Sequence, residues 1–146
     1  DKSRSRGLGD VYKRQESDII NRYIDSLKKD LSSSNPQLKS FNEKLDNGIK
    51  ILIKFTDWIK NKMQKSKDDV SAACNDYLKV LGYVAVAHSW IKVLEVSFEN
   101  YDTNKEFYED KINTAKFYFE RVLPRIESHY ITAVSGSDYI MKHKFN

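Results

Sequence analysis

The side chains best suited to metal binding or catalysis are few and scattered in this sequence. The histidines are His88, His129 and His143, and the one cysteine is Cys74. A di-iron site in a helical bundle needs Glu-x-x-His pairs that project inward, and the sequence contains no such pair. A zinc site needs about four nitrogen or sulfur ligands in tetrahedral geometry. The spacing therefore predicts no metal-binding residues.

Two of these residues lie in one long apolar segment and have alternative interpretations. His88 is either a ligand-pocket histidine or a core histidine that is hydrogen-bonded to a neighbour, and the second situation is the commoner one. Cys74 is expected to be a small buried hydrophobe. No basic residue lies one helical turn away from it to favour the thiolate, so a cysteine nucleophile is not expected.

Motifs for phosphate binding and for nucleophilic catalysis are absent. The sequence has no G-x-G-x-x-G, no G-x-x-x-x-G-K-[ST] and no G-x-S-x-G motif. The only G-x-G is formed by Gly7 and Gly9, near the start of the chain, and Ser135, Gly136 and Ser137 are typical of a helix end. We therefore predict no catalytic residue, no cofactor-binding residue and no metal ligand in this chain.

Aromatic residues gather towards the C-terminal part of the chain and have two interpretations. With nearby basic residues they could stack single-stranded nucleic acid bases, or they could form a core and a packing face. Interleaved acidic residues cancel the positive charge, which favours the second interpretation. The aromatic residues are Phe107, Tyr108, Phe117, Tyr118 and Phe119. Trp58, Trp90 and Tyr118 exceed what one thin bundle core can bury, and they predict an apolar patch that contacts another domain or subunit.

Composition and charge favour a helical protein without a nucleic acid or membrane partner. Only 5 glycines and 2 prolines interrupt the 146 residues. The net charge is +4, and residues 1–15 carry five Lys or Arg and two Asp, so residues 16–146 are close to neutral. The single cysteine, the lack of an apolar run of about 20 residues and the lack of a secretory signal lead us to expect a soluble cytoplasmic protein.

The first 15 residues differ from the rest of the chain. They have no helical periodicity, and the stretch SRGLGDVYKRQ resembles translated adaptor sequence from sequencing reads. We predict that residues 1–15 are a disordered, non-native tail and that residues 16–146 are the folded domain. The alternative is a genuine disordered basic arm. If the tail is an artefact, the chain is a fragment without its natural N-terminus.

Hydrophobic periodicity and capping residues predict four helices. The first covers about residues 17–33. The second covers residues 36–65 after an Asn35 cap, with Gly48 at a close approach to another helix. The third covers residues 66–100 and begins with Ser66 and Asp69 as a capping box. Because it is apolar on most sides, we expect it at the buried centre, with Gly82 against a partner helix.

The fourth predicted helix begins at Thr103, with Glu106 completing a capping box. Its apolar stripe includes Phe119, and Pro124 predicts a kink inside it because proline lacks the N–H that would bond the carbonyl four residues earlier. Gly136 is expected to end this helix in a left-handed conformation, and residues 138–143 to add one turn. The predicted fold is all-α, an antiparallel four-helix bundle with a short extra C-terminal turn.

Two segments resemble the extra C-terminal domain of a subset of acyl-CoA dehydrogenases. The first is NDYLKVLGYVAVAHSWIKVLEVSF, residues 75–98, in which a Tyr-Leu pair precedes Leu81 and Gly82, then a stretch rich in small residues that ends in Trp90. The second is INTAKFYFERVLPRIESHYITAVSGSDYIM, residues 112–141, with its T-A-x-F-x-F-x-R-V-L-P motif. The presence of Ser89 after His88, where the family often has Gly or other small residues, is one departure.

The resemblance implies a helical C-terminal domain with a structural or oligomerisation role in an FAD-dependent enzyme. That enzyme would oxidise an acyl-CoA of fatty acid metabolism to the 2,3-enoyl-CoA and pass electrons to an electron-transfer flavoprotein. The flavin pocket and catalytic base would lie in upstream domains, so this fragment alone is expected to be inactive. Expected partners are those domains and a homo-oligomer. The alternatives are a stand-alone helical interaction protein without catalytic activity and a nucleic-acid-binding bundle that uses the basic arm.

Overall fold

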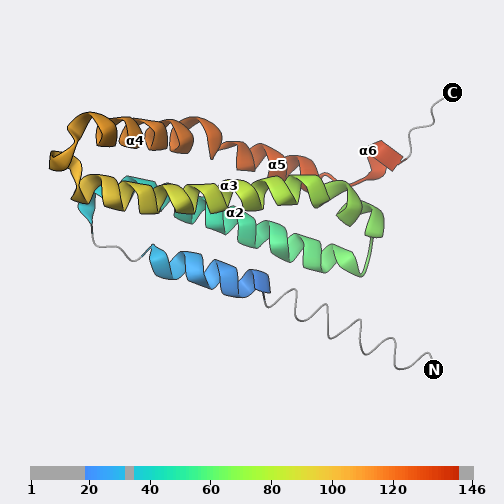
Figure 1. The fold of residues 1–146 in the computed structure, drawn as a ribbon. Helices are drawn as coiled ribbons and strands as arrows, with labels where there is room; N and C mark the ends of the chain where they lie inside the picture. Colours follow the sequence, from blue (N-terminus) through green and yellow to red (C-terminus); the bar gives the residue numbers. More distant parts are fainter. Residues whose placement is uncertain (1–18, 32–34, 142–146) are drawn as a thin grey trace, which may run out of the picture. The chain divides into compact units, whose positions relative to one another are not determined.

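The computed structural model describes residues 19–31 and 35–141, and the chain divides into two compact units, residues 1–33 and residues 34–146 (Figure 1). In the first unit, residues 19–30 form an α-helix. This helix lies within the predicted range 17–33, while the ends of that range and the predicted tail 1–15 lie outside the described residues. The described residues contain no strand, which confirms the all-α class.

The second unit begins with the short 3-10 helix η1 (Pro36–Leu38), followed by α2 (Lys39–Met63). The predicted cap is confirmed, since the Asn35 side chain accepts a hydrogen bond from the Gln37 backbone N–H at 3.0 Å. Proline stands at the first helical position, where its missing N–H costs nothing. The predicted single helix therefore starts with a tighter 3-10 turn.

The chain reverses at residues 64–66, and α3 (Lys67–Glu99) runs back along α2 (Figure 1). Ser66 caps α3 as predicted, because its hydroxyl accepts a hydrogen bond from the Asp69 N–H at 3.2 Å. Asp68 and Asp69 lie in the first turn, where negative charge is favourable to the helix dipole.

The predicted cap of the next helix is wrong by one residue. Thr103 ends the 3-10 helix η2 (Tyr101–Thr103), and its hydroxyl donates to the Asn100 carbonyl. Asn104 caps α4 (Lys105–Phe117) instead, by accepting a hydrogen bond from the Phe107 N–H at 3.3 Å. Asparagine is at least as good a cap as threonine, and the preceding 3-10 turn leaves it in the capping position.

Pro124 interrupts the helical path, as predicted, but not by a simple kink. The π-helix η3 (Tyr118–Val122) follows α4, and α5 (Arg125–Val134) begins after Pro124. In η3 the Leu123 N–H donates to the Tyr118 carbonyl at 2.9 Å, five residues back. The wider turn accommodates the missing proline N–H. Figure 1 shows the resulting offset between α4 and α5.

The end of the chain follows the prediction as far as it is described. Gly136 has φ +88°, a left-handed conformation that L side chains rarely adopt, and it terminates α5. The short helix α6 (Asp138–Met141) is the predicted extra turn, while residues 142 and 143 lie outside the described residues.

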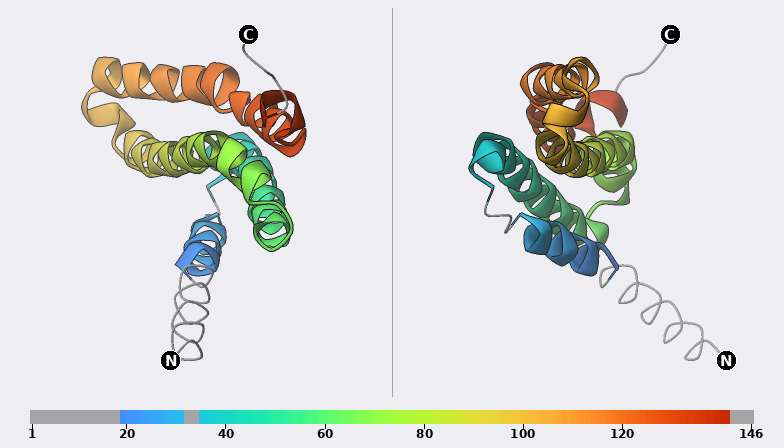
Figure 2. Two further views of the ribbon diagram at one scale, coloured as in Figure 1. Left: turned by 90° about the vertical axis from the view of Figure 1, so that its right-hand side faces the viewer. Right: turned by 60° about the vertical axis from the view of Figure 1, so that its left-hand side comes forward.

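The predicted four-helix antiparallel bundle is not confirmed. The segment predicted as its first helix belongs to the separate unit 1–33, and its fourth helix is divided at η3 and Pro124. Within residues 34–146, α4 and α5 lie along one side of α3 and α2 along another (Figures 1 and 2). The amphipathic pattern could not reveal the division at η3, because apolar periodicity continues across a π turn.

Aromatic residues fill the core of the second unit. Phe55 is fully buried and makes edge contacts with the rings of Trp58, Tyr77 and Tyr130 at centroid distances of 5.2–6.2 Å. Phe119 is 1% exposed and packs edge-on against Phe41 at 5.2 Å, which confirms its predicted core position. Such pairs add to the hydrophobic gain from burial.

Gly48 lies where α2 meets two other helices, as predicted. A Cβ atom built on it would lie 3.4 Å from the Ile126 side chain and 3.5 Å from that of Val84. Gly82 has the opposite environment, because a Cβ there would have no neighbour within 4 Å. The prediction that a partner helix packs on Gly82 within this domain is therefore wrong.

Helix α3 is not buried on all sides, contrary to expectation. Its inner side packs against α2, α4 and α5, but Leu78, Val86 and Val96 on its outer side are exposed. By length and composition alone α3 could cross a membrane, with a mean hydropathy of 1.2 over an 18-residue window. Core helices of soluble proteins meet the same criterion, so this observation assigns no membrane role.

Candidate functional site

The residues considered as metal or catalytic groups are not brought together. The described residues contain no group of three or more His, Cys, Asp or Glu side chains that could hold a metal ion. His88 is half-buried on α3, and His143 lies outside the described residues. Cys74 is exposed, so its predicted burial is wrong. It lies on the side of α3 that faces away from the core. Because this segment is apolar on most sides, the sequence pattern does not indicate which side is buried.

One pair of ionisable side chains was missed by sequence reasoning. His129 Nδ1 of α5 lies 2.8 Å from Asp76 Oδ1 of α3, and the side chains are 21% and 19% exposed. The Tyr83 ring lies 5.9 Å from the imidazole ring. The two partners are 53 residues apart in sequence, so no local pattern could predict this link. It connects α3 to α5.

A denser polar cluster joins the start of α3 to the end of α5. Asp69 Oδ1 accepts hydrogen bonds from the Ser137 N–H at 2.9 Å and from the Ser137 hydroxyl at 2.7 Å. Asp69 Oδ2 pairs with Lys62 Nζ at 2.7 Å. These hydrogen bonds, from Lys62 first and then from Ser137, hold the pKa of the Asp69 carboxyl well below its usual range. A Cβ on Gly136 would lie 3.4 Å from Asp69 Oδ1.

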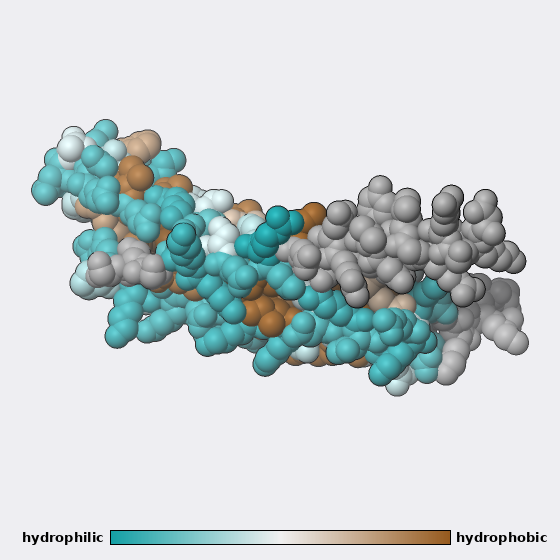
Figure 3. Space-filling view, turned by 90° about the horizontal axis from the view of Figure 1, so that it is seen from below, coloured by the Kyte–Doolittle hydropathy of each residue, from teal (hydrophilic) through white to brown (hydrophobic). Residues whose placement is uncertain are grey.

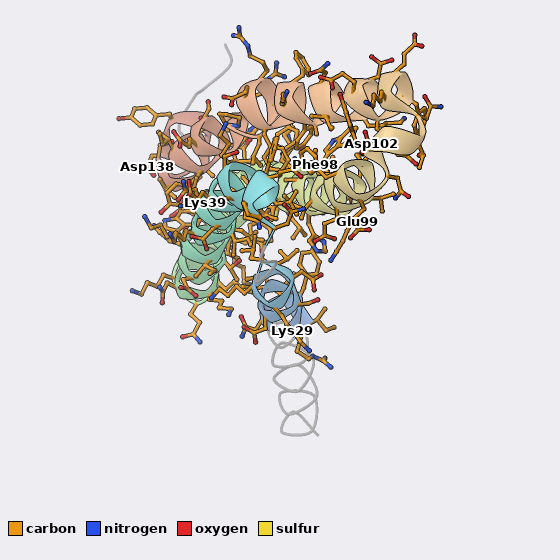
Figure 4. All side chains as sticks on the ribbon, turned by 90° about the vertical axis from the view of Figure 1, so that its left-hand side faces the viewer. Lys29, Lys39, Phe98, Glu99, Asp102 and Asp138 are labelled. Carbon is orange, nitrogen blue, oxygen red and sulfur yellow. The ribbon has the colours of Figure 1, made fainter. Side chains whose placement is uncertain are left out.

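The same cluster borders an open hollow of about 770 Å³. Its lining includes Lys62, the carboxylates of Asp69 and Asp138, and the turn that contains Gly136. Asp138, at the start of α6, is labelled in Figure 4. Two carboxylates beside a single lysine oppose the binding of a pyrophosphate group. These residues therefore do not fit FAD.

A smaller hollow of about 380 Å³ lies where α3 turns into α4. Phe98 and Asp102, labelled in Figure 4, line it together with Tyr101 and Glu109. The Tyr101 hydroxyl donates to Glu109 Oε2 at 2.7 Å, and this hydrogen bond raises the pKa of the phenol. Because the bond joins η2 to α4, the arrangement stabilises the turn.

The predicted aromatic cluster divides between core and surface. Phe119 is buried, whereas Phe107 and Phe117 are 49% and 62% exposed. Lys111 Nζ lies 5.0 Å from the centre of the Phe107 ring. The Tyr118 hydroxyl donates to the Tyr83 carbonyl at 2.8 Å, and burial, followed by the proximity of Tyr83, raises the pKa of Tyr118 to about 12. Tyr118 and Phe119 of η3 thus attach this segment to α3 and α2, whereas Phe107 and Phe117 lie on the surface of α4.

The most distinctive surface of the second unit is the outer side of α3. We call it the α3 outer face and define it as residues Leu78, Gly82, Ala85, Val86, Ser89, Val93 and Val96, all exposed or half-buried. Figure 3 shows one face of the molecule, which is mostly hydrophilic and has some hydrophobic residues exposed within it. A continuous apolar helix face is what a binding surface for another protein requires.

Comparison with known proteins identifies the domain type. Residues 18–144 match the model of the family described as acetyl-CoA dehydrogenase C-terminal like. No curated protein matched the chain. The match covers almost the whole sequence. The chain therefore belongs to the acetyl-CoA dehydrogenase C-terminal-like family.

Proposed function

We propose that this chain is the C-terminal structural and oligomerisation domain of an FAD-dependent acyl-CoA dehydrogenase, which oxidises an acyl-CoA to the 2,3-enoyl-CoA. The family match over residues 18–144 carries this proposal. The exposed α3 outer face supports a role in contact with another domain or subunit, because an apolar helix face gains free energy when it is covered.

In this proposal the flavin and the catalytic base lie upstream of the domain. FAD needs groups that bind its pyrophosphate, and the hollow beside Asp69 presents carboxylates there. The described residues also include no metal-binding cluster that could serve another redox group. The domain on its own would bind no flavin and oxidise no acyl-CoA.

The proposed partners follow from the same assignment. They are the upstream dehydrogenase domains of the same polypeptide, a second subunit of a homo-oligomer, and an electron-transfer flavoprotein that accepts electrons from the parent enzyme. We propose a cytoplasmic enzyme of fatty acid metabolism with no nucleic acid or membrane partner. Near neutrality of residues 16–146 supports the absence of a nucleic acid partner.

The test is to recover the upstream coding sequence and to express the full-length protein beside a version that ends before residue 18. The full-length protein should be yellow from bound flavin and should reduce an artificial electron acceptor with an acyl-CoA. The truncated protein should keep the flavin spectrum but change its oligomeric mass. A gene that encodes no flavin-binding domain upstream would contradict the proposal and favour a stand-alone interaction protein.

A further inference from the structure

We propose that α4 is a mobile strap. Together with η2 it lifts from α3 as one unit while α2, α3 and α5 stay packed, and the π turn η3 with Pro124 is its hinge. This inference goes beyond the proposed function and does not rest on it. It requires no flavin and no upstream domain, so it can be tested on the chain itself.

The apolar contacts that hold α4 in place are few. Ile112 and Ala115 are the buried residues among its 13, and an alanine buries only one methyl group. The rings of Phe107 and Phe117 stay 49% and 62% exposed, so they add little to the packing on α3. A helix of this length is only marginally stable by itself in water. The stability of α4 therefore depends on a small contact area.

A hollow of about 380 Å³ borders α4 near the end of α3. Glu109, Ile112 and Lys116, which lie on one side of α4, line this hollow together with Phe98 of α3 and Tyr101 of η2. One of the two buried residues of α4 thus has empty space beside it where close-packed atoms would otherwise lie. The missing dispersion contacts lower the free energy needed to move α4 away from α3.

Helix α5 follows on the same side of α3 but is held more firmly. His129 Nδ1 lies 2.8 Å from Asp76 Oδ1 of α3. The ring of Tyr130 packs edge-on against that of Phe55 of α2 at 5.5 Å. Helix α5 therefore packs on two helices, whereas α4 packs chiefly on α3 (Figures 1 and 2). Segments with few buried contacts open at a lower free energy than the rest of a domain, so we expect α4 to open before α5.

The hinge between α4 and α5 is anchored but has an interrupted backbone. The Phe119 ring packs on that of Phe41 at 5.2 Å, which fixes η3 to α2. The Tyr118 hydroxyl donates to the Tyr83 carbonyl at 2.8 Å, which fixes η3 to α3. Pro124 has no N–H to donate back into the turn, so the regular helical hydrogen-bond pattern does not continue from η3 into α5. The strap can therefore move without pulling α5 with it.

The other end of α4 is joined to α3 by η2. The Tyr101 hydroxyl donates to Glu109 Oε2 at 2.7 Å, so η2 and α4 are linked and would move together. The bend needed for this movement lies at Asn100, which ends α3. Its φ of −107° and ψ of 10° are already outside the α-helical region. Both ends of the strap thus have a turn that is not α-helical.

The first test is native-state hydrogen exchange of the full 146-residue chain, measured by mass spectrometry at several urea concentrations. We expect the amides of α4 to exchange about 10-fold or more faster than those of α5 and of the central part of α3. Their exchange should also depend less on urea, because lifting one helix exposes less surface than global unfolding does.

The second test measures how fast a buried thiol reacts with an alkylating reagent. The background is Cys74→Ser, since Cys74 is exposed and would react itself. Ala115→Cys reports the opening of α4. Ala73→Cys on α3 is the matched control, because both alanines are 0% exposed. We expect labelling at position 115 to be about 10-fold or more faster than at position 73.

A change at the hinge should act on the strap alone. Tyr118→Phe removes the hydrogen bond to the Tyr83 carbonyl, so it should accelerate labelling at position 115 by about 2- to 10-fold. Labelling at position 73 should stay the same. Tyr139→Phe is the control for this substitution, because Tyr139 is 87% exposed and its change should affect neither rate.

Three results would overturn the inference. They are equal exchange rates for the amides of α4 and α5, equal labelling at positions 115 and 73, and an equal effect of Tyr118→Phe at both positions. Each would mean that α4 leaves α3 only when the whole domain unfolds. If Ala115→Cys prevents folding, hydrogen exchange of the wild-type chain decides the question.

Discussion

The Asp69 carboxylate, in the first turn of α3, pairs with Lys62 of α2 and accepts two hydrogen bonds from Ser137. Its pKa is lowered in the folded chain, so its contribution to stability is present above the unfolded pKa of about 3.9 and is lost as the pH falls towards the folded pKa. We expect Asp69→Asn to lower the melting temperature at pH 7 and to have a smaller effect near pH 2.

Circular dichroism melts of both proteins at several pH values check this expectation. Asp57→Asn is the control, because Asp57 is exposed on α2 and its substitution should have little effect at either pH. A melting-temperature difference for Asp69→Asn that stays constant from pH 7 to acid would show that the carboxylate charge is not what matters.

Phe119 and Phe117 are two residues apart but have opposite environments. Phe119 is 1% exposed and contacts Phe41, whereas Phe117 is 62% exposed. We expect Phe119→Ala to lower the free energy of unfolding by about 3–5 kcal/mol, since it removes a buried ring and leaves a cavity. Phe117→Ala should change it by less than about 0.5 kcal/mol. Urea denaturation measures both values, and equal effects would mean that Phe119 is not a core residue.

Among the helices, α2 and α3 each contain one glycine, and the packing around them differs. Gly48 faces the side chains of Ile126 and Val84 at 3.4 and 3.5 Å, while nothing lies within 4 Å of a Cβ on Gly82. We therefore expect Gly48→Leu to lower the free energy of unfolding by about 1–3 kcal/mol through overpacking. Gly82→Leu should not destabilise the monomer, because leucine favours a helix more than glycine does.

Urea denaturation at low protein concentration compares the two glycine variants without a contribution from any association. A large loss of stability in Gly82→Leu would mean that a helix does pack on α3 at this position. That result would support the original sequence prediction and contradict the structure. Equal tolerance of both substitutions would mean that α2 does not approach α3 and α5 as closely as the structure places it.

For the chain as a whole, most of the net positive charge comes from residues 1–15, which supply +3 of the net +4. We expect any weak affinity of the full chain for single-stranded DNA to fall steeply with added salt and to disappear when residues 1–15 are removed. Fluorescence anisotropy with a labelled oligonucleotide at two salt concentrations makes the comparison. Binding that survives this deletion would point to the aromatic side chains of α4 as a nucleic acid surface.

The sequence by itself determined the helical class, several helix caps and the core position of Phe119. Asn35, Ser66 and Gly136 act within one or two turns of their own position, so local chemistry is sufficient to predict them. Apolar periodicity likewise located Phe119 in the core. The family resemblance rests on motifs that are continuous in sequence, so the order of the residues is sufficient to reveal it, and it agrees with the match to residues 18–144.

Only the tertiary structure decided which side of α3 is covered and which distant residues meet. A helix that is apolar all round carries no signal for its inner face, so Cys74 and Gly82 were placed wrongly. The contacts of Asp69 with Ser137 and of Asp76 with His129 join residues more than 50 positions apart, and such pairs depend on how whole helices pack. The physical reason is that local propensities act over a few residues. Which distant side chains come into contact depends instead on how the helices of the whole domain pack together.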